Sequence, residues 1–226
     1  MPMLGNVAPT PFDLNFSLFG IPVRIHPLFW LVSALLGWDA RDPRIMIIWI
    51  VCVFISILVH ELGHALTAQS YGWPPHIVLY SFGGYASFQP SWGYTTARAI
   101  LVLVAGPGAG FVLYGVVRAL EHLLIHQDVE IPYYALVAID KMEFINLWWG
   151  LVNLLPVFPL DGGQISREAL TWWRPHDGFD LSLKISLVVA ALAAYFLFTR
   201  GMTFNALLFG SLAFDNLQKL QRGRFR

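Results

Sequence analysis

A long apolar run that ends in a polar motif constrains this chain more than any other feature. The run begins at Ile45, extends to Val59 and leads directly into His60-Glu61-Leu62-Gly63-His64, with helical residues continuing to about Tyr71. A helix that crosses a bilayer needs about 20 mostly apolar residues, which this segment supplies. Ionisable groups at such a depth are costly and indicate a functional site. The sequence therefore predicts a membrane helix that carries chemistry in its interior.

The motif has the spacing of a zinc site. His60 and His64 are four residues apart and share one face of a helix, where both imidazoles can reach one Zn²⁺. Glu61 lies beside them and can take a proton from an attacking water molecule. The alternative is a pair of packing histidines with a glutamate that reaches toward the membrane surface. Three ionisable groups so close together in an apolar helix favour the functional interpretation.

The composition is that of an integral membrane protein. Of the 226 residues, 57% are hydrophobic and only 12% are charged, whereas about a quarter of the residues in soluble domains are charged. The 14 basic and 14 acidic residues balance, so nothing in the overall charge favours nucleic-acid binding. The single cysteine, Cys52, excludes an internal disulfide and a cysteine-rich zinc module. Any metal site must therefore use histidines and carboxylates.

Six apolar segments predict an all-α polytopic membrane protein with about six transmembrane helices. They are residues 27–38, 45–71, 99–125, 133–155, 181–198 and 202–214, of which the first and last are short for a full crossing. Two other segments, 12–25 and 76–88, favour either β-strands or amphipathic loops. Strands there would form small β elements near the cytoplasmic side. We expect one membrane domain, residues 1–226, with no soluble appendage.

The basic residues predict the orientation in the membrane. With six helices, one side takes Arg24, Arg98, Arg167, Arg174, Lys184, Lys219, Arg222, Arg224 and Arg226, and the other takes Arg41, Arg44 and Arg200. The positive-inside rule then places both termini in the cytoplasm. At a rise of 1.5 Å per residue, His60 lies about 16 Å from the cytoplasmic end of its helix. The expected location is a prokaryotic cytoplasmic membrane.

A catalytic zinc ion with an open position takes three protein ligands, so a third ligand must come from another helix. Asp161 is the best candidate. It lies in the segment 153–163, NLLPVFPLDGG, where prolines break the fourth helix near the cytoplasmic face and two glycines free the backbone. The alternative is an ordinary helix-terminating turn. The buried histidine motif elsewhere in the chain favours the ligand.

Together, the motif at residues 60–64 and the segment 153–163 resemble the site-2 protease family of intramembrane zinc metalloproteases. Weaker similarity lies in Gly20-Ile21-Pro22-Val23-Arg24-Ile25-His26, Phe82-Gly83-Gly84 and Ala105-Gly106-Pro107. The resemblance implies one Zn²⁺ per chain, bound by His60, His64 and Asp161. It also implies that Glu61 is the general base and acid and that Asn153 positions or polarises the scissile peptide. The chain is similar to a minimal family form without a PDZ or CBS module.

The function that this resemblance implies is intramembrane proteolysis. We expect an endopeptidase that hydrolyses a peptide bond within or near a transmembrane segment of a membrane-protein substrate, as in regulated intramembrane proteolysis. The partners are then that substrate and the lipid bilayer. Cleavage requires an extended substrate, which the segment 77–88 can hold by strand pairing. The sequence leaves the substrate's identity and the oligomeric state open.

Three other functions compete with this prediction. A metal transporter would carry polar ligands at successive depths along several helices, whereas here they gather at one level. A membrane zinc protease that acts on prenylated C-termini would usually use a second glutamate as a ligand. A catalytically inactive binding relative is disfavoured because Glu61 is present. Two isolated histidines, His26 and His76, favour structural hydrogen bonding, and Gly106 and Gly110 favour close helix packing rather than a place in the site.

Overall fold

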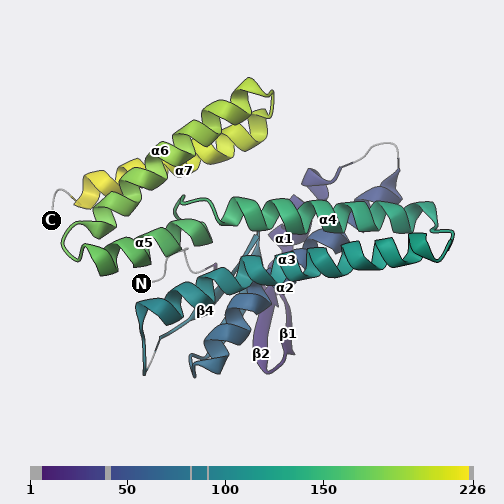
Figure 1. The fold of residues 1–226 in the computed structure, drawn as a ribbon, viewed down its shortest axis with the longest axis horizontal. Coiled ribbons are helices and arrows are strands. Elements are labelled where there is room, and N and C mark those ends of the chain that lie inside the picture. The colour runs from purple at the N-terminus through teal and green to yellow at the C-terminus, as the bar shows by residue number, and fades with distance from the viewer. Residues whose placement is uncertain (1–6, 39–41, 82, 91, 224–226) are drawn as a thin grey trace. The chain divides into compact units, whose positions relative to one another are not determined.

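The computed structural model describes residues 7–38, 42–81, 83–90 and 92–223, and they group into two compact units (Figure 1). The first unit comprises Met1–Gly93 and Ala105–Gly150, and the second comprises Tyr94–Val104 and Leu151–Arg226. Four residues used in the sequence analysis lie outside the described residues: Arg41, Phe82, Arg224 and Arg226. The single domain expected from the sequence stays a prediction.

The first unit is built around the helix that carries the histidine motif. This helix, α2 (Pro43–Ser70), begins where the Asp42 side chain accepts a hydrogen bond from the backbone N–H of Arg44, at 2.9 Å. Pro43, at the first helical position, lacks an N–H that would need a partner there. The unit also contains α1 (Pro27–Leu36), most of α3 (Thr96–His126) and most of α4 (Tyr133–Asn153). The predicted helices in these four regions are confirmed.

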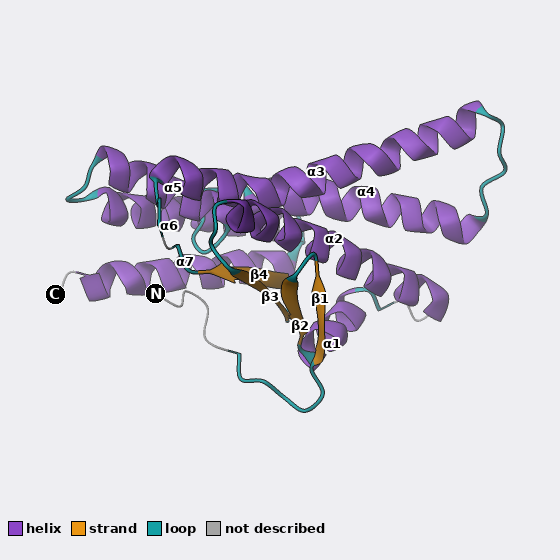
Figure 2. Cartoon of the chain, turned by 90° about the horizontal axis from the view of Figure 1, so that it is seen from below, coloured by secondary structure: helices purple, strands orange, loops and turns teal. Residues whose placement is uncertain are grey.

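A four-stranded sheet forms from the two segments whose structure the sequence left open (Figure 2). Its strands are β1 (Leu14–Leu18), β2 (Ile21–Ile25), β3 (Pro75–Tyr80) and β4 (Gly83–Phe88), in that spatial order. The β1–β2 and β3–β4 pairs are antiparallel, whereas β2 and β3 run parallel. Both segments are therefore strands rather than loops. Among the described residues, β4 pairs with β3 alone, which makes it an edge strand.

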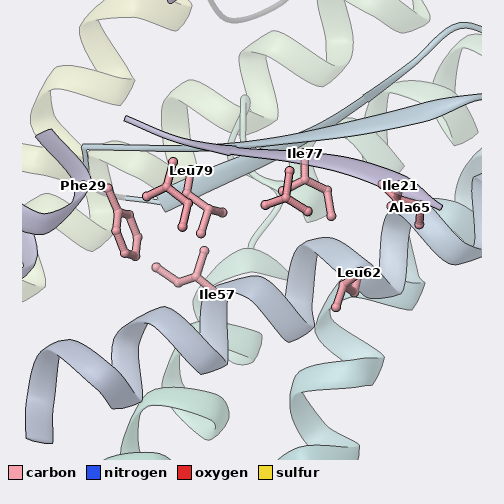
Figure 3. Close-up of a cluster of buried hydrophobic side chains, with 9 residues drawn as sticks. Ile21, Phe29, Ile57, Leu62, Ala65, Ile77 and Leu79 are labelled. Atoms are coloured by element: carbon pink, nitrogen blue, oxygen red, sulfur yellow. The ribbon is translucent and has the colours of Figure 1, made fainter. Parts of the chain in front are cut away.

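The core of the first unit lies between the sheet and α2 (Figure 3). Alternate residues of β2 point inward, because side chains along a strand face opposite sides in turn. These inward residues join neighbours from β3, α1 and α2 in one apolar cluster: Ile21, Val23, Ile25, Phe29, Ile57, Leu62, Ala65, Ile77 and Leu79. The sheet thus covers the part of α2 that contains the histidine motif.

The second unit contains the C-terminal helices α5 (Asp161–Trp173), α6 (Gly178–Thr199) and α7 (Thr203–Gly223). A tight turn at Gly201, with a φ of +74°, joins α6 to α7. Small and apolar side chains pack this unit, namely Val157, Ala190, Phe209 and Ala213. The helices α6 and α7 match the last two predicted segments. The sequence analysis did not predict α5.

Three helices are long and apolar enough to span a membrane among the described residues: α2, α3 and α6. This makes the chain an integral membrane protein, mostly helical with a small sheet. The other predicted spans do not meet the same criteria. The helix α1 has 10 residues, and α4 contains Asp140, Lys141 and Glu143 within its apolar stretch. In α7, the second half carries Asp215, Lys219 and Arg222.

Candidate metal centre

The two histidines of the motif converge on one point. His60 and His64 are buried on α2, with exposed fractions of 3% and 6%, and their Nε2 atoms lie 3.2 Å apart. Two nitrogens bound to one tetrahedral zinc ion are expected to be about 3.3 Å apart, because each Zn–N bond is about 2.0 to 2.1 Å. The rings are edge-on to each other, at 81°. The pair therefore already has the separation of two ligands of one ion.

The third helix comes close to this pair at Gly106. A Cβ atom built on Gly106 would lie 2.2 Å from Nε2 of His64, so only glycine leaves room for the imidazole. The prediction that Gly106 serves helix packing alone is therefore incomplete. At Gly110 a Cβ would make only an ordinary contact with the carbonyl oxygen of Asn146, at 3.7 Å, so the packing there does not require a glycine. The Ala105-Gly106-Pro107 similarity was the sequence signal for a role of Gly106.

Another glycine of the motif sets how closely α2 and α3 approach. A Cβ on Gly63 would lie 2.3 Å from the carbonyl oxygen of Ala105. Such a distance allows no side chain, because the atom opposite is backbone and cannot rotate away. Gly63 and Gly106 thus bring the backbone of α3 against the face of α2 that carries His64. The two glycines are part of the architecture of the histidine pair.

The predicted base, Glu61, lies under the edge strand of the sheet. Its side chain is 5% exposed. A Cβ atom on Gly84 of β4 would lie 2.9 Å from Cγ of Glu61 and 3.1 Å from its Oε1. The carboxylate therefore lies against the backbone of β4. A strand edge beside the carboxylate provides hydrogen-bonding groups for an extended peptide near the histidine pair.

The other two predicted site residues belong to the second unit. Asn153 is the last residue of α4 and Asp161 is the first residue of α5, and each is 8% exposed. A carboxylate at the N-terminus of a helix is favoured in its charged form by the helix dipole. The irregular segment 154–160 between them contains both prolines, as the sequence predicted.

The two glycines after Asp161 have a different role from the predicted one. Both lie in the first turn of α5 rather than in a free segment. A Cβ on Gly162 would lie 2.2 Å from the carbonyl oxygen of Leu154, and one on Gly163 would lie 2.3 Å from the backbone nitrogen of Phe158. The glycines therefore let α5 start directly against the preceding segment. The sequence predicted that these glycines free the backbone, whereas in the structure they allow close packing.

Several other polar residues of the first unit make contacts of their own. His26 caps α1, because its Nδ1 accepts a hydrogen bond from the backbone N–H of Leu28, at 3.1 Å. His76 lies on an exposed position of β3. On α4, Lys141 pairs with Asp140 at 3.1 Å and Glu143 pairs with Arg118 of α3 at 3.3 Å. The cap formed by His26 agrees with the structural role expected from the sequence.

The fold and this site define a class: a helical membrane protein with a buried His-Glu-x-x-His motif, the arrangement of a metallopeptidase. Comparisons with known proteins identify the family within that class. The model of "Peptidase family M50" matches residues 135–197, a stretch that includes Asn153 and Asp161. The solved "Site-2 Protease from Methanocaldococcus jannaschii" has the same fold, with a TM-score of 0.65 over 92% of this chain and 95% of that chain at 24% identity. The chain therefore carries a match to peptidase family M50 and has the fold of a site-2 protease.

Curated relatives extend the similarity over most of the chain. The protein sll0528 of Synechocystis sp. is 33% identical over 170 residues, 69% of this chain and 43% of that protein. Zinc metalloprotease MJ0392 of Methanocaldococcus jannaschii is 32% identical, over 69% of this chain and 44% of its own length. Stage IV sporulation protein FB of Bacillus subtilis is 28% identical, over 76% and 56%. The chain thus spans about half the length of these relatives.

Proposed function

We propose that this protein is an intramembrane zinc endopeptidase that hydrolyses a peptide bond within or near a transmembrane segment of another membrane protein. The observation that carries the proposal is the histidine pair, buried in an apolar helix with its Nε2 atoms 3.2 Å apart. Two imidazoles so close together in an apolar environment gain most when they share a cation. Similarity to peptidase family M50 and to curated zinc metalloproteases supports the same chemistry.

The proposed donor set for one zinc ion is His60, His64 and Asp161. All three are buried, and each offers one atom of a type that binds zinc. Two imidazoles and one carboxylate leave a fourth position for water, as in catalytic zinc sites. When bound, zinc lowers the pKa of water to about 7 and polarises a carbonyl group. The separation of the two histidine nitrogens fits such an ion, as described above.

In this proposal Glu61 moves the proton. Its carboxylate takes a proton from the attacking water and gives it to the amine nitrogen that leaves when the peptide bond breaks. The residue is next to His60 in the chain and nearly fully buried, and its side chain lies against the backbone of β4 at Gly84. This buried position next to the histidine motif supports the base role.

Asn153 is the proposed donor to the substrate carbonyl. Its amide can donate a hydrogen bond to the oxygen on which negative charge develops during attack. Its 8% exposure and its place at the end of α4 favour a fixed orientation. The competing role of Asn153 is a hydrogen bond between helices. An Asn153→Asp variant lacks the amide donor to the substrate carbonyl, so its activity separates the two roles.

The edge strand β4 is the proposed holder of the substrate. A peptide bond inside a helix has its carbonyl engaged, so the substrate must be extended before cleavage. Pairing with the open edge of β4 would extend it and bring it past Glu61, which lies against Gly84. This arrangement makes backbone pairing, rather than particular side chains, the main source of substrate affinity.

For the orientation, we propose six helices that cross or enter the membrane in one domain, with both termini in the cytoplasm of a prokaryote. This orientation is supported by the basic residues, most of which lie in segments that the six-helix topology places on the cytoplasmic side of the membrane. The helix α2 would then run inward, with the zinc site about 16 Å from its cytoplasmic end. The three candidate spans α2, α3 and α6 are compatible with this topology.

The first test is the metal content of the purified full-length chain. The proposal expects about one zinc ion per chain, lost in Asp161→Ala and retained in Glu61→Gln. Proteoliposomes that contain fluorescent single-span peptides with helix-breaking residues then report cleavage, with Glu61→Gln as the inactive control. Zinc that survives Asp161→Ala would remove the third ligand, and a chain without metal would favour an inactive binding relative. Zinc movement across the bilayer without cleavage would favour a transporter.

A further inference from the structure

Both backbone polar groups of Phe158 are bound by side chains from other helices. The backbone N–H of Phe158 donates to Oγ of Ser186 on α6, at 2.6 Å. The carbonyl oxygen of Phe158 accepts a hydrogen bond from Nδ2 of Asn216 on α7, at 2.8 Å. Phe158 lies in the irregular segment 154–160, where no helix or strand satisfies these groups. Two side chains from two helices therefore replace the missing secondary structure.

The two side chains are among the most deeply buried polar residues of the chain. Ser186 is 1% exposed and Asn216 is 0% exposed. A polar side chain in an apolar helix is costly unless it is hydrogen-bonded, so each position needs a reason. Ser182, one turn earlier on α6, differs because its hydroxyl donates to the carbonyl of Phe179 in the same helix. Only Ser186 of this pair of serines supports the irregular segment.

The ring of Phe158 is held as well. The ammonium of Lys219 on α7 lies 4.4 Å from the ring centroid. The guanidinium carbon of Arg167 on α5 lies 5.7 Å from the same centroid. Cations over an aromatic face at these distances are attracted to it. Contacts from α5, α6 and α7 thus fix the backbone and the side chain of one residue.

Phe158 precedes Asp161 by only three residues, and the start of α5 packs against it. The close approach of Gly163 to the backbone nitrogen of Phe158 shows how tightly the two are joined. We propose that Ser186 and Asn216 are positioning residues of the metal centre, which hold the peptide groups of Phe158 and thereby fix the carboxylate of Asp161 for zinc. This inference rests on the proposed function, because it takes Asp161 as a zinc ligand.

The test compares zinc affinity in the purified full-length chain and three variants. Ser186→Ala and Asn216→Ala remove the two hydrogen bonds, and Ser182→Ala is the matched control on the same helix. Residues that orient a metal ligand typically contribute 10- to 100-fold to metal affinity. We expect zinc dissociation constants to rise by about that factor in the first two variants and by less than about twofold in the control. Chelator competition measures these constants.

A second readout separates positioning from general stability. Co²⁺ accepts the same ligands as zinc and reports their geometry in its visible spectrum. The spectrum should change in Ser186→Ala and Asn216→Ala, and it should be kept in Ser182→Ala and in Ser186→Thr, which retains the accepting oxygen. Melting temperatures measured without metal show how far each variant is destabilised.

The outcomes separate this inference from the proposed function. A natural chain that binds no zinc overturns the zinc centre and this inference with it. A natural chain that binds zinc, with unchanged affinity and an unchanged cobalt spectrum in Ser186→Ala and Asn216→Ala, overturns the positioning role alone. The positioning role is also overturned if zinc affinity falls only in proportion to the melting temperature of each variant while the cobalt spectrum stays unchanged.

Discussion

Gly106 and His64 are in direct contact across two helices, because a Cβ atom on Gly106 would fall 2.2 Å from Nε2 of the imidazole. The backbone of α3 therefore forms part of the wall around the histidine pair. The absence of a side chain at position 106 is as necessary to the site as the presence of the histidine. A residue without functional groups thus decides whether the imidazole of His64 has room.

The first prediction follows from that contact. Gly106→Ala should weaken zinc binding at least tenfold, because the new methyl group forces the ligating ring of His64 to turn. Gly108→Ala is the control on the same helix, since a Cβ there meets nothing within 4 Å. Zinc titration of both variants checks the prediction. Full zinc affinity in Gly106→Ala would show that the imidazole does not need this space.

A second prediction concerns the approach of α2 to α3. Gly63→Ala should destabilise the protein by about 1 to 3 kcal/mol, because its Cβ would lie 2.3 Å from the carbonyl oxygen of Ala105. Gly115→Ala, on the partner helix α3, should instead be neutral or slightly stabilising, since no atom lies within 4 Å and alanine favours helices. Thermal unfolding in detergent compares the two. Equal effects of the two substitutions would contradict the close approach.

The third prediction tests the open edge of β4. Successive N–H groups of a strand point to opposite edges, so one of Tyr85→Pro and Ala86→Pro removes a bond to β3 and the other removes only a donor at the open edge. The variant that keeps the natural melting temperature identifies the outward position. It should lower peptide cleavage several-fold and retain zinc. Unchanged cleavage in that variant would exclude substrate pairing at this edge.

A fourth prediction concerns alkaline pH. In the second unit, Tyr94 donates a hydrogen bond to Oε2 of Glu168. Partial desolvation of the half-exposed side chain and this bond raise the pKa of Tyr94 from 10.0 to about 12. Because the raised pKa belongs to the folded state, the stabilisation is complete below pH 10 and is lost as the pH rises from 10 toward 12. The melting temperature should fall in this window in the natural chain and less in Tyr94→Phe, and equal profiles would contradict the assignment.

Much of the fold can be predicted from residue patterns, because membrane helices follow from the length of apolar segments alone. The helices around residues 45–71 and 99–125 are examples, and both meet the criteria for membrane spans in the structure. The strands could be anticipated only as one of two options, since their polar and apolar residues alternate over short stretches. Pairing between β2 and β3, which are about 50 residues apart in the chain, determines that these segments form strands rather than loops.

The rest depended on contacts between distant segments. The helix α5 escaped prediction because it follows two prolines and has two glycines in its first turn, which normally disfavour a helix. Its glycines are required by the backbone of Leu154 and Phe158, which sequence alone does not place nearby. The roles of Gly106, Ser186 and Asn216 have the same origin. The histidine motif was predictable because all of its geometry lies within two turns of one helix.

Among the described residues, one edge of β4 has no partner strand, which has a cost for handling this protein and an advantage for studying it. Open strand edges pair readily with other strands, so purified material without substrate is expected to self-associate through β4. Short extended peptides added during purification should suppress this association by occupying the edge. The same property suggests a route to inhibitors, because a ligand that supplies backbone amides in the extended form needs no knowledge of the natural substrate's sequence.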